Sequence, residues 1–289
     1  MPTHFASQKH QPVRAYAALL LVVVLAACGR GSDSAALVHD GRGVAVTVSS
    51  PLSRIVSTAP NITGILLALG QGHRLVGISD QCPQPDPARP LPRLGGLSGP
   101  DAERISSLSP GLLIASYEGN PPQLADSMRA LKIPLYVARI GSLKALEKTM
   151  LDLERLVCGT NTQSLHQTLS NMRSEIAGRL RGLRVFLQIG TTAEAWTFGR
   201  STLVHDALQA AGAIHLGALR PGTFPRLDAE SMAALKPDLV VLLSGHNPAR
   251  DRAFWKRHAP QARILTPQTD LFEQPGPWIA KAIHELARQ

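Results

Sequence analysis

The sequence lacks the common signatures of enzymes. It contains no G-x-S-x-G nucleophile motif, no Walker phosphate-binding loop and no G-x-G-x-x-G segment after a predicted strand. Its histidines after residue 28 include no pair at positions i and i+4, so a helical zinc site of the metalloprotease kind is excluded. We therefore predict no catalytic residues and no metal ligands. A two-lobed metal-dependent enzyme or redox sensor remains as an alternative function.

Aromatic side chains and clustered basic residues are also scarce. Phe, Trp and Tyr make up 4% of the 289 residues. Basic residues outnumber acidic ones by 30 to 21, but they are scattered, and no basic run is interleaved with aromatics. The sequence therefore predicts no nucleic-acid partner. It leaves open whether Cys82 and Cys158 form a disulfide.

The longest apolar run marks a targeting segment at the N-terminus. Residues 15–27 follow Lys9 and Arg14 and end before Cys28, and these 13 residues are too few to span a bilayer as a helix. Residues 1–27 therefore predict a cleaved signal peptide. Cys28 after small residues resembles the bacterial lipoprotein box, in which this thiol carries the lipid; the other interpretation is an ordinary signal with an incidental cysteine. We expect residues 28–50, rich in Gly, Ser and Asp at their start, to form a flexible tether on an exported, lipid-anchored protein.

A ten-residue pattern occurs twice in the chain. Asp-Ala-Glu-x-x-x-x-Leu-x-Pro begins at Asp101 and again at Asp228, 127 residues later. Each copy leads into an apolar segment, which predicts a short helix followed by a buried strand. The segments that begin at Arg54 and Arg184 form a weaker repeat upstream. The repeats predict two similar lobes.

Short apolar runs alternate with amphipathic segments in both halves, which predicts an α/β fold with parallel sheets covered by helices. The predicted strands are 54–57, 75–78, 112–114, 135–137, 185–189, 239–243 and 263–265, and the predicted helices of the first lobe are 62–69, 101–108 and 122–131. Apolar residues at helical spacing between residues 142 and 180 predict helix, with residues 159–161 as a kink or a break. The predicted domains are an N-terminal lobe (51–141), a linking helix region (142–182) and a C-terminal lobe (183–289).

The order of these segments resembles the helical-backbone substrate-binding proteins of ATP-driven importers. The resemblance rests on residues 54–63, 74–80 and 91–96 and on the paired Asp-Ala-Glu helices, and it covers about residues 52–289. It implies two Rossmann-like lobes joined by a long backbone helix, with the ligand in the cleft between them. It also implies a periplasmic monomer that delivers its ligand to an ABC permease and ATPase complex. The chain is most similar to the cobalamin binders of this family, which implies cobalamin as the transported ligand and no cofactor.

Loops after the predicted strands supply the candidate ligand-binding residues. A large, flat, mostly apolar ligand needs aromatic faces and a few polar groups. The candidates are Pro60, Asn61, Gln81, Tyr117, Trp196, Phe224, His246 and Asn247. Trp196 and Phe224 match positions that are aromatic in the cobalamin binders. In the first lobe, however, Gln81, Leu97 and Ser116 stand where those binders have aromatics. This departure keeps haem or a ferric siderophore as the alternative ligand.

Glu103 and Glu230 occupy the third position of the two repeats. A carboxylate in the first turn of a helix is favoured by the backbone dipole, and this effect alone explains both residues. In the resembled family, matching glutamates engage arginines of the membrane permease. The resemblance therefore implies that Glu103 and Glu230 dock the chain onto its permease.

Overall fold

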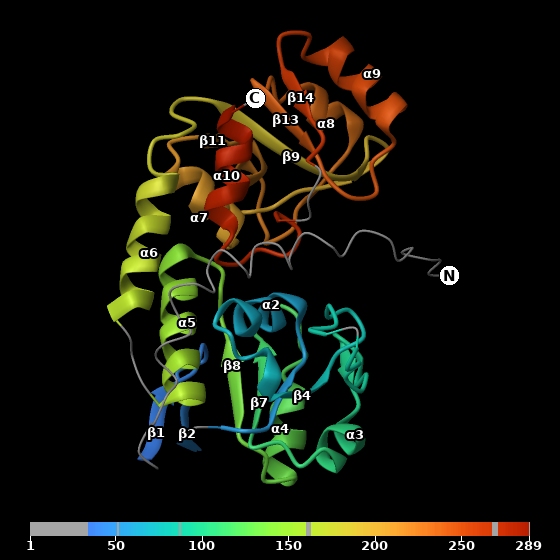
Figure 1. Cartoon of the computed structure of the whole chain (residues 1–289). Helices are drawn as coiled ribbons and strands as arrows, with labels where there is room; N and C mark the ends of the chain where they lie inside the picture. Colours follow the sequence, from blue (N-terminus) through green and yellow to red (C-terminus); the bar gives the residue numbers. More distant parts are fainter. Residues whose placement is uncertain (1–33, 51, 87, 160–162, 268–270, 289) are drawn as a thin grey trace. The chain divides into compact units, whose positions relative to one another are not determined.

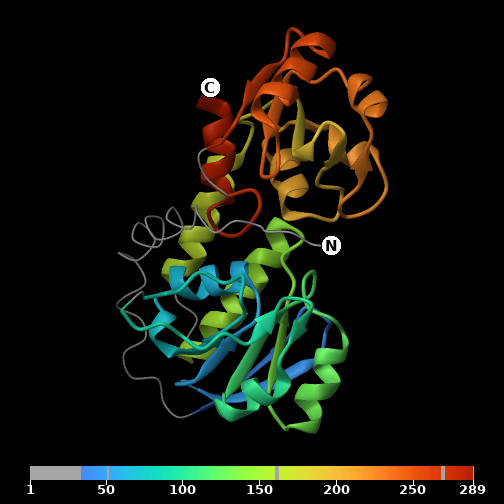
Figure 2. The same cartoon turned by 90° about the vertical axis from the view of Figure 1, so that its right-hand side faces the viewer.

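The computed structural model describes residues 34–50, 52–86, 88–159, 163–267 and 271–288. These residues form two compact units, one made of residues 34–140 and 144–168 and the other of 141–143 and 169–288 (Figures 1 and 2). The predicted signal peptide and Cys28 lie outside the described residues. No helix within the described ranges is both long and apolar enough to cross a membrane.

The first unit is built on a parallel four-stranded sheet with the order β4-β3-β7-β8. Its main elements are β3 (Ile55–Ser57), α2 (Pro60–Ala68), β4 (Leu75–Ile78), α3 (Ala102–Ser107), β7 (Leu112–Ser116), α4 (Gln123–Ala130), β8 (Leu135–Ala138) and α5 (Leu143–Cys158). Val137 lies in the core formed with α3 and α4. Tyr136, which points to the opposite face, donates a hydrogen bond to Asp152 of α5 at 2.7 Å. Helices therefore cover both faces, as a buried parallel sheet requires.

An N-terminal hairpin of β1 (Ser34–His39) and β2 (Ala45–Ser50) belongs to the first unit. This corrects the prediction of a flexible tether, because residues 34–50 are ordered by two kinds of contact. Side chains at every second position of both strands are buried, and Asp40 closes the turn. The Asp40 carboxylate accepts hydrogen bonds from the N–H groups of Arg42 and Val44, and a further one from the N–H of Val137 in β8.

The second unit contains a mixed sheet with the order β12-β10-β9-β13-β14, and β11 pairs with the start of β9. Its elements are β9 (Arg184–Thr191), β10 (Glu194–Trp196), α7 (Leu203–Ala210), β11 (Ile214–His215), β12 (Arg226–Leu227), α8 (Ala229–Ala233), β13 (Leu239–Leu242), α9 (Pro248–His258), β14 (Arg263–Leu265) and α10 (Ile279–Arg288). Strands β9, β13 and β14 are parallel, whereas β10 and β12 form an antiparallel edge. Met232 of α8 and Trp255 of α9 lie in one core cluster with Phe186 of β9, so α8 and α9 cover the same face of the sheet.

The linking region consists of two helices, α5 and α6 (Gln163–Ile176). Helix α5 ends at Gly159, whose φ of 72° lies in the left-handed region and whose N–H donates to the carbonyl of Arg155. Glycine adopts this conformation at little cost, so it commonly ends helices. Of the two possibilities that the sequence left open, the break is the one that forms.

The two Asp-Ala-Glu repeats have the same local structure in both units. Asp101 caps α3 by accepting from the N–H groups of Glu103 and Arg104, and Asp228 caps α8 by accepting from the N–H of Ser231. Shortly after each helix comes a residue with positive φ, Ser109 at 45° and Lys236 at 49°.

The arginine at the first strand of the main sheet in each unit contacts this same helix end. Arg54 donates to the carbonyls of Leu108 and Ser109, and Arg184 donates to those of Leu235 and Lys236. The weaker sequence repeat, which begins at Arg54 and at Arg184, therefore corresponds to equivalent arginine contacts in two similar lobes. The predicted α/β class with two such lobes is confirmed.

Candidate functional site

Four predicted residues lie at one edge of the first unit's sheet. Pro60 and Asn61 begin α2 directly after β3, Gln81 follows β4, and Tyr117 follows β7. Because β4, β3 and β7 are adjacent and parallel, their carboxyl ends share an edge, where ligands commonly bind in α/β folds. Tyr117 is 49% exposed, so part of this residue is accessible to a ligand.

Arg139 lies over the ring of Tyr117, with the guanidinium carbon 4.8 Å from the ring centroid. This contact is a cation–π interaction between the ends of β7 and β8. Arg139 was not among the predicted site residues. Its position directly after the strand predicted at residues 135–137 was a signal that could have identified it. The edge therefore offers a positive charge to an anionic group of a ligand.

Asn120 ties three loops together behind this edge. Its Oδ1 accepts from the Thr58 hydroxyl and from the N–H of Ser116, both at 2.9 Å, and its Nδ2 donates to the carbonyl of Leu97 at 2.7 Å. Gln81 Oε1 accepts from the N–H of Leu97 at 3.1 Å. The side chains of Gln81 and Asn120 therefore position the loop at Leu97.

A pocket of about 290 Å³ opens beside Tyr117. Ser116 and Asn120 line it on the polar side, and Leu124 and Val137 line it on the apolar side. Tyr117 is the one predicted ligand-binding residue in its lining. The pocket extends the candidate edge toward α4.

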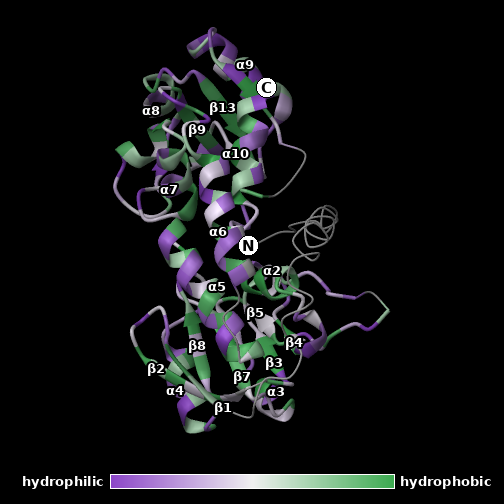
Figure 3. Ribbon diagram, turned by 60° about the vertical axis from the view of Figure 1, so that its left-hand side comes forward, coloured by the Kyte–Doolittle hydropathy of each residue, from purple (hydrophilic) through white to green (hydrophobic). Residues whose placement is uncertain are grey.

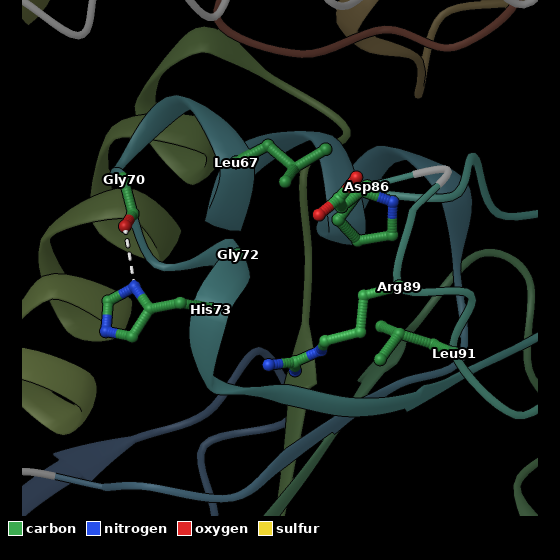
Figure 4. A pocket seen from close by; sticks show the side chains of 8 residues that line it. Leu67, Gly70, Gly72, His73, Asp86, Arg89 and Leu91 are labelled. Atoms are coloured by element: carbon green, nitrogen blue, oxygen red, sulfur yellow. Dashed lines mark hydrogen bonds between the residues drawn. The ribbon is translucent and has the colours of Figure 1, made fainter.

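A second pocket, of about 340 Å³, lies elsewhere on the first unit and contains none of the predicted residues. Figure 4 shows it between the end of α2 and the loop that carries Asp86 and Arg89. The His73 ring contacts the carbonyl of Gly70 at 3.2 Å, and Arg89 donates to the carbonyl of Leu75 at the start of β4. This pocket therefore lies toward the amino end of β4, away from the candidate edge.

In the second unit, Trp196 and Phe224 come from two paired segments. The N–H of Thr197 donates to the carbonyl of Pro225 at 3.0 Å, so the end of β10 runs beside the segment that contains Phe224. Trp196 is 42% exposed and Phe224 is 49% exposed. Buried Phe198 supports Phe224 with its ring edge-on, at a centroid distance of 5.9 Å. The second unit thus presents two aromatic rings that are accessible to a ligand.

His246 and Asn247 follow β13, and both make local contacts. The Asn247 side chain caps α9 by accepting from the N–H of Arg250 at 3.0 Å. His246 Nδ1 lies 2.5 Å from the carbonyl of Leu243, and its Nε2 is buried without a partner among the described residues. Neither ring nitrogen of His246 is therefore presented at the surface in this conformation, and its contact with a ligand stays a prediction.

A histidine pair in the second unit was missed from the sequence. Nδ1 of His205 in α7 lies 3.1 Å from Nδ1 of His215 in β11. Burial lowers the pKa of His215 to about 3, and it lowers the pKa of His205 as well. No spacing rule signals this pair, because the packing of α7 against β11 brings it together. In the described ranges, no group of three or more His, Cys, Asp or Glu side chains could hold a metal ion.

Cys82 is a free, buried thiol, so it forms no disulfide with Cys158. Its sulfur lies 3.1 Å from the hydroxyl of Ser79, and burial raises its pKa. A buried thiol with a raised pKa reacts poorly. The redox-sensor alternative gains no support from Cys82.

Glu103 and Glu230 are both exposed in the first turn of their helices, α3 and α8. Neither carboxylate forms an ion pair with a described residue. The hydrogen bonds that the capping Asp228 accepts from Ser231 lower the pKa of Asp228, which keeps this helix start anionic. The same position in each unit therefore carries a free negative charge.

Comparison with known proteins finds similar proteins along most of the chain, although no family model matches. The chain is 28% identical over 250 residues to the vitamin B12-binding protein of Photorhabdus laumondii, which covers 83% of this chain and 88% of that protein. The structure is similar to the periplasmic vitamin B12 binding protein BtuF of Vibrio cholerae, with a TM-score of 0.69 and 23% identity over 82% of this chain and 96% of that one. It is also similar to the periplasmic heme-binding protein RhuT of Roseiflexus sp. RS-1, with a TM-score of 0.63 and 26% identity over 82% and 97%. The resemblance predicted from the sequence is confirmed.

Proposed function

We propose that this chain is the substrate-binding protein of an ATP-driven importer and that its ligand is a corrinoid of the cobalamin type. The observation that carries the proposal is the pair of exposed rings, Trp196 and Phe224, in a chain similar to vitamin B12-binding proteins. A flat macrocycle with an apolar face gains most of its binding free energy from such aromatic surfaces. The exported, periplasmic location of those relatives is part of the proposal.

The proposal assigns the ligand to the carboxyl-end edge of the first unit's sheet and, in the second unit, to the two exposed rings and the loop after β13. The first unit supplies Pro60, Asn61, Gln81 and Tyr117, and the second supplies Trp196, Phe224, His246 and Asn247. Arg139 adds a cation beside Tyr117, which suits the phosphate of a corrinoid side chain. Support for this assignment comes from each unit separately: its aromatic rings are exposed, and the remaining assigned residues lie in loops after its strands or at the start of the helix that follows.

Titration calorimetry of the purified protein against cyanocobalamin, haemin and a ferric siderophore tests the ligand. We expect saturable one-to-one binding of cyanocobalamin, with the other two compounds bound far more weakly. Binding of haemin alone would instead establish the haem alternative. No binding of any of the three would refute both ligand assignments.

One observation favours haem as the second candidate. The Arg139 guanidinium lies over the Tyr117 ring, so a phenol and a cation occur together, and these groups suit the iron and a propionate of haem. The similarity to a heme-binding protein of known structure points the same way. If haem binds, Tyr117→Phe should change its absorption spectrum, whereas Trp196→Phe should not.

The proposal also assigns Glu103 and Glu230 to docking on the permease. Charge-assisted hydrogen bonds of this kind contribute about 1.5 to 3 kcal/mol each. The double reversal of Glu103→Arg with Glu230→Arg should therefore abolish uptake in cells and leave ligand affinity of the isolated protein unchanged. The matched control is Asp126→Arg with Glu175→Arg, which makes the same charge change at two exposed carboxylates, again one in each unit. Normal uptake by the first variant would reject the docking role.

A further inference from the structure

A basic segment of the second unit has no part in the proposed binding of ligand or permease. Residues 248–267 contain α9 and β14 and carry five cations and one carboxylate, so their formal net charge is 5 − 1 = +4. The cations are Arg250, Arg252, Lys256, Arg257 and Arg263, and the carboxylate is Asp251. None of the five cations forms an ion pair with a residue that the structure describes.

The inner face of α9 is fixed by Asp251 and Trp255, one turn apart. The Asp251 carboxylate is fully buried and accepts from the N–H groups of Thr192 at 2.8 Å and Asn247 at 2.6 Å. The Trp255 ring is fully buried, and its N–H donates to Gln188 at 2.7 Å. The only carboxylate of the segment is therefore turned inward and does not face solvent beside the cations.

The opposite face of α9 exposes Arg250, Lys256 and Arg257. In Figure 3 the outward part of α9 is coloured as hydrophilic. Arg263, at the start of the neighbouring strand β14, is exposed as well. Arg252 differs, because it is tied down by hydrogen bonds to the Ile264 carbonyl and the Thr266 hydroxyl. We call the three exposed cations of α9, together with Arg263, the α9 basic face.

Helix stability does not account for the α9 basic face. The helix dipole favours Lys256 and Arg257 in the last turn, but it disfavours a cation such as Arg250 in the first turn. Like charges gathered without counter-charges repel one another and add no stability. The face therefore has the charge expected of a contact with an anionic partner.

We infer that the α9 basic face binds the anionic headgroups of a phospholipid membrane. No large apolar side chain of residues 248–267 is exposed, whereas a protein interface usually has an apolar core. No exposed aromatic ring lies on the face to stack nucleobases, as single-stranded nucleic acid requires. A face of four exposed cations without an exposed large apolar side chain matches lipid phosphates. The choice of a membrane rests on the proposed function in one respect, because an importer's binding protein works beside a lipid bilayer.

Vesicle binding tests this inference without ligand or permease. The protein would start at Gly29, which retains every described helix and strand and removes Cys28 as a lipid site. Co-sedimentation with vesicles of phosphatidylglycerol and phosphatidylcholine is compared with vesicles of phosphatidylcholine alone. Each cation near an anionic surface strengthens binding about fivefold, so Arg250→Gln, Lys256→Gln and Arg257→Gln together should weaken binding to the anionic vesicles roughly 100-fold. Binding should also be lost in about 1 M NaCl, where the Debye length is about 3 Å.

The matched control is the triple variant Lys144→Gln, Arg179→Gln and Arg181→Gln, which removes the same charge from exposed positions elsewhere. It should bind the anionic vesicles nearly as the unmodified protein does. Equal losses in the two triple variants would overturn the inference, because they would show only an effect of net charge. Equal binding of the unmodified protein to both kinds of vesicle would overturn it as well. Because cyanocobalamin affinity is measured separately, failure here leaves the proposed function standing.

Discussion

Replacement of Trp196 by alanine is the sharpest test of the candidate site. Trp196 is 42% exposed in the second unit, and its ring is one of two exposed aromatic faces there. If a corrinoid covers this ring, the apolar area that it hides from water is lost in Trp196→Ala. The size of the expected effect follows from that area.

A tryptophan side chain offers up to about 250 Å² of contact area. The exposed 42% corresponds to roughly 100 Å² that a ligand can cover. At about 25 cal/mol per Å², and with some contact retained by alanine, the loss is about 2 kcal/mol. The dissociation constant for cyanocobalamin should therefore rise about 30-fold.

Calorimetry or intrinsic fluorescence quenching would measure this change, and Ile214→Ala provides the control. Ile214 is apolar and 48% exposed in the same unit. It pairs with Arg184 at the start of β9, whereas Trp196 pairs with Ile189 near its end. The two positions are five residues apart along the strand, or roughly 17 Å. A Trp196→Ala dissociation constant within about twofold of the unmodified value, or an equal loss in Ile214→Ala, would refute the assignment.

Three further predictions concern stability and location. Burial of His215 should make the free energy of unfolding depend on pH. The pKa of His215 is about 3 in the folded chain and about 6.5 in the unfolded chain, so only the unfolded chain binds a proton there as the pH falls below 6.5. The free energy of unfolding should therefore fall by about 2 kcal/mol between pH 7 and pH 5. Urea unfolding of His215→Gln should show a shallower dependence on pH, and an unchanged slope would contradict the assignment. Asn120→Ala should lower the free energy of unfolding by about 2 kcal/mol, since the Ser116 N–H loses its acceptor and the Thr58 hydroxyl loses the nearer of its two acceptors. A change close to zero in urea titration would mean that water replaces the lost side chain. Cys28→Ser should move the protein from the membrane fraction to the soluble periplasmic fraction; unchanged partition into detergent would exclude lipidation.

The regular elements of the fold could be predicted because their signals are local. Capping by Asp101 and Asp228 depends on residues within one helical turn, and the same pattern in both units predicted α3 and α8 to within one residue at the start. Parallel strands buried on both faces appear as continuous apolar runs, and the strand at residues 75–78 was predicted with its observed bounds.

The hairpin of β1 and β2 was missed, although its apolar residues recur at every second position. The Gly and Ser residues around it favoured a tether, and the contacts that hold it come from distant residues. Asp40 reaches Val137, and Lys148 of α5 donates to the carbonyl of His39. No local pattern encodes such contacts.

The candidate site was predictable in position and less so in detail. Loops after parallel strands are the expected place for ligand contacts, and Tyr117 is exposed there. Trp196 is exposed as well, but it lies at the end of the antiparallel strand β10. The roles of Gln81 and Asn120 depend on a hydrogen-bond network through Leu97, between segments far apart in sequence. The pairing of Tyr117 with Arg139 requires β7 and β8 to be neighbours, which only the sheet order establishes.

The ordered hairpin also sets how far the protein could move from a membrane. If Cys28 carries a lipid, only residues 29–33 separate it from β1. Six residue steps of at most about 3.6 Å reach no farther than roughly 20 Å, whereas a free tether through residue 50 would reach roughly 80 Å. The first unit, to which the hairpin is hydrogen-bonded, would therefore stay in a thin layer above the lipid surface. The protein would then meet its permease by diffusion within this layer. The effective concentration for docking would be set by the short tether and would depend little on the total concentration of the protein in the compartment.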